Sequence, residues 1–400
     1  MSRVSGFFLA LLIACSDDFK VDHPIVFTGE LISLSNVEAT LSARIASRGN
    51  QPLTESGFVW GLYPGDNDGI RLINPDVSAN EYVLKTSTPF IQEETYYVRA
   101  YAQSQHAITY GREVAFRVGG TKDLGSWTTI TTSINQGTAC ELTISFNVGA
   151  LSYFLLSNGA VYAYNPTNNN LQIRGTNPQL ANAMFGASYL GQAYVFIKNS
   201  FYLFNPVDLS LSQLSPIPNQ AELTGSTMFL LDDYLYVGLG YNFTSGQATH
   251  EFWKYKIPSD SWQRIADFPG NGKEFAFGFS LAGNGFVGGG SDSKGDFFET
   301  AKDLWQYDPK TDQWKRKMDI PVKPVYFDSA VAFNGMGYCF SGGDLLEYNA
   351  DFNSWRKMTH FGDKGYLCYP NLLAINQHVY LISSTDNFGN GSLNIWSYAK

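Results

Sequence analysis

The feature that most constrains the fold is a repeat that runs through residues 121–400. Six segments end in a large aromatic residue, and in five of them a second large apolar residue follows seven positions later, with a Pro or Gly seven positions beyond that. The three sets are Tyr164, Phe204, Tyr255, Tyr307, Tyr348 and Tyr398; Leu171, Leu211, Trp262, Trp314 and Trp355; and Pro178, Pro218, Pro269, Pro321 and Gly362. Such a period indicates copies of one supersecondary unit that bury their apolar faces against each other.

The composition predicts that these units are β-sheets. Charged residues make up 16% of the 400 residues, aromatic residues 15%, and there are 38 glycines. This balance favours strands and tight turns over helical bundles, which are rich in Glu, Lys, Ala and Leu. The length suffices for two or three domains. The net charge of −9 argues against a nucleic-acid partner, because that backbone is itself anionic.

One repeat carries a closer resemblance to a known family. The segment from Asp303 through Trp314 reads DLWQYDPKTDQW, and the pairs Gly288-Gly289 and Gly342-Gly343 stand before two of the aromatic segments. This pattern resembles the kelch repeat. The resemblance implies an all-β chain in which each repeat is a four-stranded blade, so that residues 121–400 form a six-bladed β-propeller. The first two repeats are degenerate, with Leu171 and Leu211 at the expected Trp positions.

The ends of the array predict how the ring closes. The sixth repeat stops two residues after Tyr398 and therefore lacks the strand that would carry its second apolar residue. Trp127, at the start of the array, supplies a residue of that kind. We therefore expect the strand around Trp127 to complete the last blade and to join the two ends of the array by backbone hydrogen bonds.

Three repeats are longer than the others, and the extra residues fall between the second and third expected strands. These enlarged loops, 240–250, 290–302 and 384–392, should emerge on one face, where loops on a rigid scaffold commonly carry function. Exposed aromatics beside Asn and Asp stack on sugars or anchor a protein partner, although they also fold back on their own blade. The predicted binding residues are Tyr241, Asn242, Phe243, His250, Asp292, Asp296, Phe297, Phe298, Glu299, Asn387 and Phe388.

The N-terminus reads as a targeting segment. Residues 1–14 hold a basic residue and a short apolar run that is too short to span a bilayer, which is typical of a signal peptide. The run ends in Leu12-Ile13-Ala14-Cys15, which resembles a bacterial lipobox; the alternative is a buried strand with a chance Cys. The resemblance implies lipid attachment at Cys15, a tether over residues 15–22, and an anchor in a Gram-negative outer membrane. Ser16-Asp17-Asp18 resembles the acidic signal that exports such lipoproteins to the cell surface.

Residues 23–118 predict a separate β-sandwich. Short alternating runs are divided by turn signals such as Gly49-Asn50-Gln51-Pro52. Phe90, Tyr96, Val98 and Ala100 resemble the tyrosine-corner strand of fibronectin type III domains, although the usual preceding Pro is absent. We expect this domain to be a spacer that holds the propeller away from the membrane.

Recognisable catalytic motifs are absent from the sequence, so we expect a non-catalytic protein without metal or cofactor. The histidines are scattered and show no ligand spacing. Cys140, Cys339 and Cys368 are too few for a disulfide framework and read as small buried hydrophobes. We expect the loop face to dock a protein partner, such as an outer-membrane β-barrel or nutrient-import complex. Two alternatives stay open: glycan binding, and a kelch-fold sugar isomerase or lyase.

Overall fold

The computed structural model contains two compact units, Met1–Lys122 and Asp123–Lys400. It describes residues 23–35, 38–62, 64–65, 67, 69–86, 90, 94–119, 125–135, 142–218, 223–292, 300–322, 324, 328–361, 366–387 and 390–399. The predicted signal peptide, Cys15 and the tether lie outside these residues. In the described part of the chain, no helix has the length and hydropathy needed to cross a membrane.

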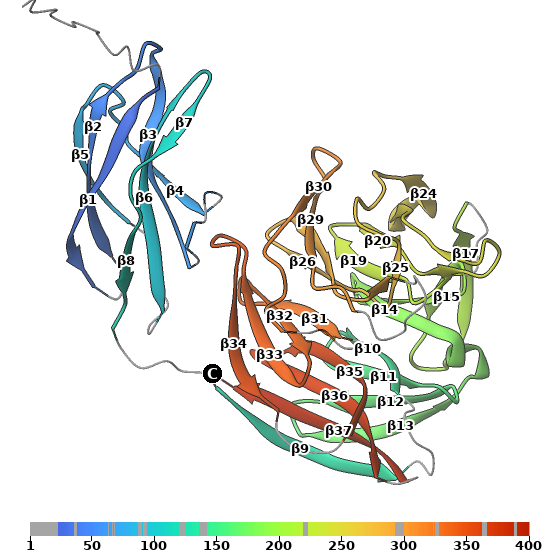
Figure 1. Cartoon of the computed structure of the whole chain (residues 1–400). Coiled ribbons are helices and arrows are strands. Elements are labelled where there is room, and N and C mark those ends of the chain that lie inside the picture. Colours follow the sequence, from blue (N-terminus) through green and yellow to red (C-terminus); the bar gives the residue numbers. More distant parts are fainter. Residues whose placement is uncertain are drawn as a thin grey trace, which may run out of the picture. The chain divides into compact units, whose positions relative to one another are not determined.

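The first unit is built from two antiparallel sheets (Figure 1). One sheet has the strand order β1-β2-β5, and the other has the order β4-β3-β6-β7, with β8 also paired to β6. The strands are β1 (Ile25–Leu34), β2 (Ala39–Ser47), β3 (Leu53–Gly61), β4 (Ile70–Ile73), β5 (Glu81–Lys85), β6 (Thr95–Ser104), β7 (Ile108–Tyr110) and β8 (Val114–Arg117). Alternation of buried and exposed residues along β2 and β6 gives each sheet one face for a shared core.

Aromatic side chains fill the core of this unit. The ring of Tyr96 is fully buried, lies 5.0 Å from that of Phe90 and stacks on Phe116 at 5.8 Å. Trp60 packs edge-on against Phe90 at 5.1 Å. The residues that suggested a tyrosine corner therefore lie at the centre of the core.

The second unit is a β-propeller of six four-stranded antiparallel sheets, as predicted. Blade 1 is β10 (Leu142–Val148), β11 (Leu151–Leu156), β12 (Ala160–Asn165) and β13 (Asn170–Thr176); blade 2 is β14 (Ala183–Tyr189), β15 (Gln192–Ile197), β16 (Ser200–Phe204) and β17 (Leu211–Pro216). Blade 3 is β19 (Thr227–Leu231), β20 (Tyr234–Gly238), β23 (Phe252–Lys256) and β24 (Ser261–Arg264); blade 4 is β26 (Phe277–Leu281), β27 (Asn284–Gly288), β29 (Leu304–Asp308) and β30 (Gln313–Arg316). Blade 5 is β31 (Ser329–Phe333), β32 (Met336–Ser341), β33 (Asp344–Asn349) and β34 (Ser354–His360); blade 6 is β35 (Tyr366–Ile375), β36 (His378–Asn387), β37 (Asn390–Ala399) and β9 (Ser126–Asn135).

The first strands of the six blades form a closed inner ring. Each contacts the first strand of the next blade, and β35 of blade 6 contacts β10 of blade 1. The outermost strand of blade 6 is β9, which pairs with β37 along its length (Figure 1). Trp127 lies opposite Tyr398, with ring centroids 5.5 Å apart. The predicted closure by the strand around Trp127 is confirmed.

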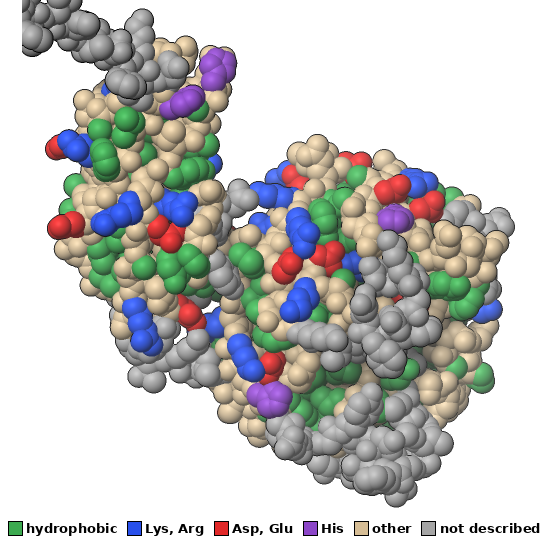
Figure 2. Space-filling model, viewed as in Figure 1, with side chains coloured by type: hydrophobic (Ala, Val, Ile, Leu, Met, Phe, Trp, Pro, Cys, Tyr) green, Lys and Arg blue, Asp and Glu red, His purple; other side chains and the backbone are tan. Residues whose placement is uncertain are grey.

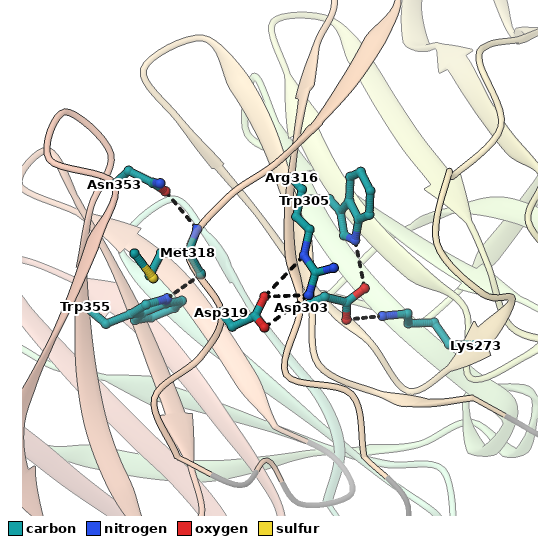
Figure 3. Close-up of polar contacts among 8 residues, drawn as sticks. All are labelled: Lys273, Asp303, Trp305, Arg316, Met318, Asp319, Asn353 and Trp355. Carbon is teal, nitrogen blue, oxygen red and sulfur yellow. Dashed lines mark hydrogen bonds and ion pairs between the residues drawn. The ribbon is translucent and has the colours of Figure 1, made fainter. Parts of the chain in front are cut away.

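Neighbouring blades are joined by a repeated pair of hydrogen bonds, which we call the inter-blade latch. In blade 5 the Asn353 Oδ1 accepts the backbone N–H of Met318 at 2.9 Å, and the Trp355 Nε1 donates to the carbonyl of the same Met318 at 3.0 Å (Figure 3). Asn353 also accepts the hydroxyl of Tyr348 at 3.0 Å. Blade 5 thus binds both the backbone N–H and the carbonyl of one residue of the preceding blade, because Met318 lies in the connection that leaves blade 4.

The same latch occurs in blades 3 and 4, where an Asp replaces Asn. The corresponding sets are Asp260, Trp262, Tyr255 and Ser215, and Asp312, Trp314, Tyr307 and Ala266. The Asx residue has positive φ each time, a conformation that Asn and Asp tolerate better than most residues. Blade 2 has Leu209 and Leu211 at these positions and packs them against apolar neighbours instead.

The three enlarged connections all lie between the second and third strands of their blades. In blade 3 the connection forms β21 (Tyr241–Asn242) and β22 (Gln247–Ala248), and β21 pairs with β18 (Leu223–Thr224). In blade 4, β28 (Ser291–Asp292) pairs with β25 (Lys273–Glu274). In blade 6 the extra residues lengthen the β36–β37 hairpin. Each enlarged connection therefore lies beside the segment that enters a first strand.

The latch makes a stability prediction. Asn353→Gly keeps a residue suited to positive φ but leaves the Met318 N–H and the buried Tyr348 hydroxyl without their shared acceptor. We expect a loss of about 2 kcal/mol in the free energy of unfolding of the propeller. The measurement is urea denaturation followed by tryptophan fluorescence. Asp351→Ala, in the exposed turn of the same hairpin, is the control; an equal loss in both variants would contradict the latch.

Candidate functional site: the axial pocket

A pocket of about 300 Å³ opens where the first strands converge. Its described lining comes from the segments that enter the first strands of blades 2, 3, 4, 5 and 6. No single blade forms the pocket, so it exists only in the closed ring. The polar and aromatic lining residues are Thr224, Ser226, Phe275, Asp328, Ser329, Tyr369 and Asn371.

Unusual backbone geometry presents two aromatic residues at the pocket. Phe275 has φ +58° and follows directly on β25. Tyr369 has φ +50° and lies in a bulge of β35 between Cys368 and Asn371. Bulges re-aim side chains, and positive φ at bulky residues is uncommon and occurs more often at functional sites. The pocket therefore has aromatic surface from blades 4 and 6, which lie on either side of blade 5.

Hydrogen bonds to the surrounding blades fix the polar groups of the pocket. The Asp328 carboxylate is 7% exposed and accepts the Ser341 hydroxyl at 2.6 Å. Ser329 Oγ accepts the backbone N–H of Leu372 at 2.9 Å, and Asn371 Nδ2 donates to the Tyr369 carbonyl at 2.8 Å. Sugar hydroxyls are the kind of group that donates hydrogen bonds to carboxylate, hydroxyl and amide oxygens and accepts them from O–H and N–H groups such as these.

Glu274 lies directly behind the lining. Its side chain packs against Gly225, where an added Cβ would lie 2.9 Å from the Glu274 Cβ. The residue is 8% exposed, and burial raises the pKa of its carboxyl above the ordinary value of 4.5. Within the described part of the chain, no hydrogen bond or ion pair to this carboxyl is found. Glu274 therefore holds its proton to a higher pH than an exposed glutamate does.

The neighbouring Lys273 is engaged elsewhere. Successive side chains of a strand point to opposite faces, and Lys273 Nζ lies 2.5 Å from Asp303 Oδ1 and donates to the Gly289 carbonyl at 3.2 Å (Figure 3). Asp303 Oδ2 also accepts the Trp305 Nε1–H at 2.7 Å. The ammonium group of Lys273 is thus fixed by blade 4 and does not pair with Glu274.

None of the predicted loop residues is among the described lining of this pocket. Tyr241 pairs with Thr224 across β21 and β18, and the ring of Phe243, which is 65% exposed, lies 5.4 Å from that of Tyr241. Asn242 Oδ1 accepts two backbone N–H groups of its own turn, and His250 is exposed at the end of the loop. These four residues lie on one connection, which is linked to the pocket by the pairing of Tyr241 with the lining residue Thr224.

The other predicted residues are only partly described. Asp292 lies in β28 opposite Lys273, and Asn387 ends β36 opposite Asn390, but their side chains are not described. Asp296, Phe297, Phe298, Glu299 and Phe388 lie outside the described residues, so these assignments stay predictions.

The sequence analysis missed the lining itself. Its residues recur a few positions after the Pro or Gly of each repeat, just before or at the beginning of the first strand and, in blade 6, within it. A polar residue before an apolar run, such as Asp328 before Ala330, was the available signal.

The expectation for one cysteine was wrong. Cys368 is disulfide-bonded, to a partner outside the described residues, whereas Cys339 is free and buried as expected. Cys368 directly precedes Tyr369 in the β35 bulge. The cross-link therefore restrains the bulge that brings Tyr369 to the pocket.

The groups around the pocket are suited to proton transfer on a small polar ligand. Asp328 presents a carboxylate, Glu274 is a carboxyl of raised pKa, and carboxyl groups in different environments commonly divide the roles of proton acceptor and donor. Acidic and basic side chains are interspersed on the visible face of the propeller (Figure 2). Among the described residues, no group of three or more His, Cys, Asp or Glu side chains could hold a metal ion.

The fold and pocket define a six-bladed β-propeller with an axial polar site. The chain is similar to curated proteins named N-acetylneuraminate epimerase. The protein from Yersinia enterocolitica is 37% identical over 116 residues, which is 28% of this chain and 29% of that protein. The Haemophilus influenzae protein is 27% identical over 132 residues (32% and 34%), and the Shigella sonnei protein is 28% identical over 180 residues (42% and 45%). The chain thus matches less than half the length of these relatives. No protein-family model matches it.

These similarities correct the functional expectation. We expected a non-catalytic protein that docks an outer-membrane complex, and this was wrong, because relatives from several species are named as an enzyme. A propeller site draws single residues from several blades, so an enzyme of this fold leaves no local catalytic motif in its sequence.

The burial of Glu274 predicts a pH-dependent stability. Between its ordinary and its raised pKa, the unfolded chain loses this proton before the folded chain does, so stability falls as pH rises. Glu274→Gln removes this loss of stability, because the Gln side chain does not ionise. We expect the variant to gain melting temperature relative to the parent as pH rises from about 4 to 7, measured by calorimetry. Asp351→Asn, in an exposed turn, should show no such trend. A difference in melting temperature between Glu274→Gln and the parent that stays constant with pH would refute the raised pKa of Glu274.

Proposed function

We propose that this protein is a sugar epimerase whose site is the axial pocket. The observation that carries the proposal is the described lining: a carboxylate, hydroxyls, an amide and two aromatic side chains converge from four blades, and the named relatives are epimerases of a sugar. Hydroxyl and amide groups bind sugar oxygens, and aromatic faces pack against the apolar face of a sugar ring.

The proposed chemistry requires only proton transfers from this chain. Epimerisation inverts a stereocentre without changing the composition of the sugar, so every proton removed is matched by a proton returned. Asp328 is placed to accept a proton from a bound sugar, and Glu274, behind Gly225, is placed to supply one. N-acetylneuraminate is the first substrate to test, because it is the sugar in the relatives' name.

We also propose that the chain is a kelch-type lipoprotein with a fibronectin type III-like spacer, anchored in an outer membrane and exposed at the cell surface. The lipobox-like Leu12-Ile13-Ala14-Cys15 supports the anchor. The two-sheet topology of the first unit supports the spacer. The disulfide at Cys368 supports an oxidising compartment outside the cytosol. Glycan at the cell surface would then be a source of substrate.

The enzymatic proposal predicts a large effect at Asp328. Asp328→Asn keeps an oxygen for the Ser341 hydroxyl but removes the proton acceptor. We expect the rate of sugar epimerisation, followed by proton NMR, to fall by about 10²-fold or more. Asp344→Asn is the matched control in blade 5, because Asp344 pairs with Lys357 and His360 instead of lining the pocket. An active Asp328→Asn variant would exclude Asp328 as the acceptor, and inactivity of the parent toward every sugar tested would refute the proposal.

The anchor proposal predicts the fate of the chain in a bacterial cell. Cys15→Ser removes the thiol that lipid attachment needs, so the variant should leave the membrane fraction and lose labelling by a fatty acid. Cys339→Ala, at the free buried cysteine, should remain labelled. If the parent chain takes up no fatty acid, the lipoprotein assignment fails.

A further inference from the structure

We propose that blade 4 carries a second sugar site, separate from the axial pocket, in which a sugar ring packs against Trp305 and binds Arg316. This inference goes beyond the proposed function, because it assigns the binding of a glycan chain rather than catalysis. It is carried by a cavity at the outer strands of blade 4 and by a comparison with the equivalent residues of blade 3.

A cavity of about 470 Å³ lies between the connection that enters blade 4 and the third and fourth strands of that blade. We call it the blade 4 cavity. Its described lining includes Gly270, Lys302, Trp305, Arg316 and Asp319, and it shares no residue with the described lining of the axial pocket. The cavity thus combines an aromatic surface with a few charged groups, which is a composition suited to a small polar ligand.

In blade 3, the equivalent tryptophan is covered by its neighbouring arginine. Trp253 stands directly opposite Arg264 in the strand pairing of blade 3, as Trp305 stands directly opposite Arg316 in blade 4. The Arg264 guanidinium lies over the Trp253 ring, 5.8 Å from its centroid. Its Nη1 also pairs with Glu251 Oε1 at 3.2 Å, so that the guanidinium is fixed beside the ring.

Blade 4 has a shorter acidic residue at the position of the blade 3 glutamate. Asp303 pairs with Lys273 Nζ at 2.5 Å and accepts the Trp305 Nε1–H at 2.7 Å (Figure 3). Arg316 pairs instead with Asp319, which accepts from its Nε at 3.3 Å and from its Nη2 at 2.9 Å. In the described part of the chain, Arg316 lies over no aromatic ring and its Nη1 has no hydrogen-bond partner.

The indole of Trp305 is therefore accessible from the blade 4 cavity. It is half-buried, and among the described residues its one ring contact is with Phe268, at 5.7 Å. The side chains of Arg316 and Asp319 are 58% and 48% exposed. A sugar ring packed on the indole brings its hydroxyls to the N–H donors of Arg316 and to the Asp319 carboxylate. Lys302, which is exposed at the same cavity, is placed to pair with the carboxylate of an acidic sugar.

The blade 4 cavity and the axial pocket lie on the same face of the propeller. Ala276, in the lining of the axial pocket, directly precedes the first strand of blade 4, and Asp303 directly precedes the third. The strands of the blade are antiparallel, so its first and third strands begin at the same face. A glycan chain bound at Trp305 is thus held on the face where the axial pocket opens.

The test uses the tetramer of N-acetylneuraminate, the sugar in the relatives' name, and the full chain. Its binding is measured by calorimetry. We expect Trp305→Ala and Arg316→Ala each to weaken binding by about fivefold or more. The matched variants of blade 3, Trp253→Ala and Arg264→Ala, should bind as the parent does, because Arg264 already covers that tryptophan.

A second measurement does not depend on the alanine variants. In heteronuclear NMR spectra of the parent, assigned with Trp305→Phe and Trp253→Phe, the tetramer should shift the indole N–H signal of Trp305 and leave that of Trp253 in place. The same shift should persist in Asp328→Asn, because Asp328 belongs to the axial pocket.

The outcomes separate this inference from the proposed function. An unshifted Trp305 signal overturns the second site and leaves the epimerase proposal standing. Equal losses of affinity in the variants of blades 3 and 4 overturn the assignment to Trp305 and Arg316. A shift of the Trp305 signal in a protein without epimerase activity supports the second site while refuting the proposed function.

Discussion

The pairing of β9 with β37 is the constraint on which the rest of the second unit depends. It joins the start of the array to its end, so that Trp127 completes a blade whose other strands come from residues 366–399. A blade cannot bury both of its faces alone, and only a closed ring gives each of the six a neighbour on both sides. The axial pocket is a product of this closure, because its lining comes from five different blades.

The blades are held together in two chemically different ways. Blades 3, 4 and 5 use the inter-blade latch, in which an Asx oxygen accepts the backbone N–H, and a Trp Nε1–H donates to the carbonyl, of one residue of the preceding blade. Blade 2 substitutes leucines and relies on apolar packing. In the closing blade, Trp127 Nε1 is buried and has no hydrogen-bond partner in the part of the chain that the structure describes. This blade relies instead on strand pairing and on ring contacts with Phe361 and Tyr398. The latches coincide with the repeats that the sequence shows most clearly.

The propeller could be predicted because its packing is periodic. Residues equivalent to Tyr307 and Trp314 recur at a fixed spacing because each blade repeats the same contacts. The sixth repeat lacks its fourth strand, and the strand at Trp127 is left over at the start of the array, so the sequence also predicts how the ring closes. The pocket could not be predicted in the same way. Asp328, Glu274 and Tyr369 occupy equivalent segments of different blades but differ in residue type, and only the three-dimensional ring brings them together. The disulfide at Cys368 could not be predicted for a related reason, because disulfide pairing depends on how close two cysteines lie in the fold and not on their spacing in the sequence.

The central proposal is that a sugar binds on the axis of the closed ring. The most direct measurement is a crystal structure of the full chain with N-acetylneuraminate, the sugar in the relatives' name. We expect a sugar ring within hydrogen-bond distance of Asp328, packed against Phe275 or Tyr369. A sugar found only on the outer loop around Phe243, or only on the N-terminal unit, would contradict it.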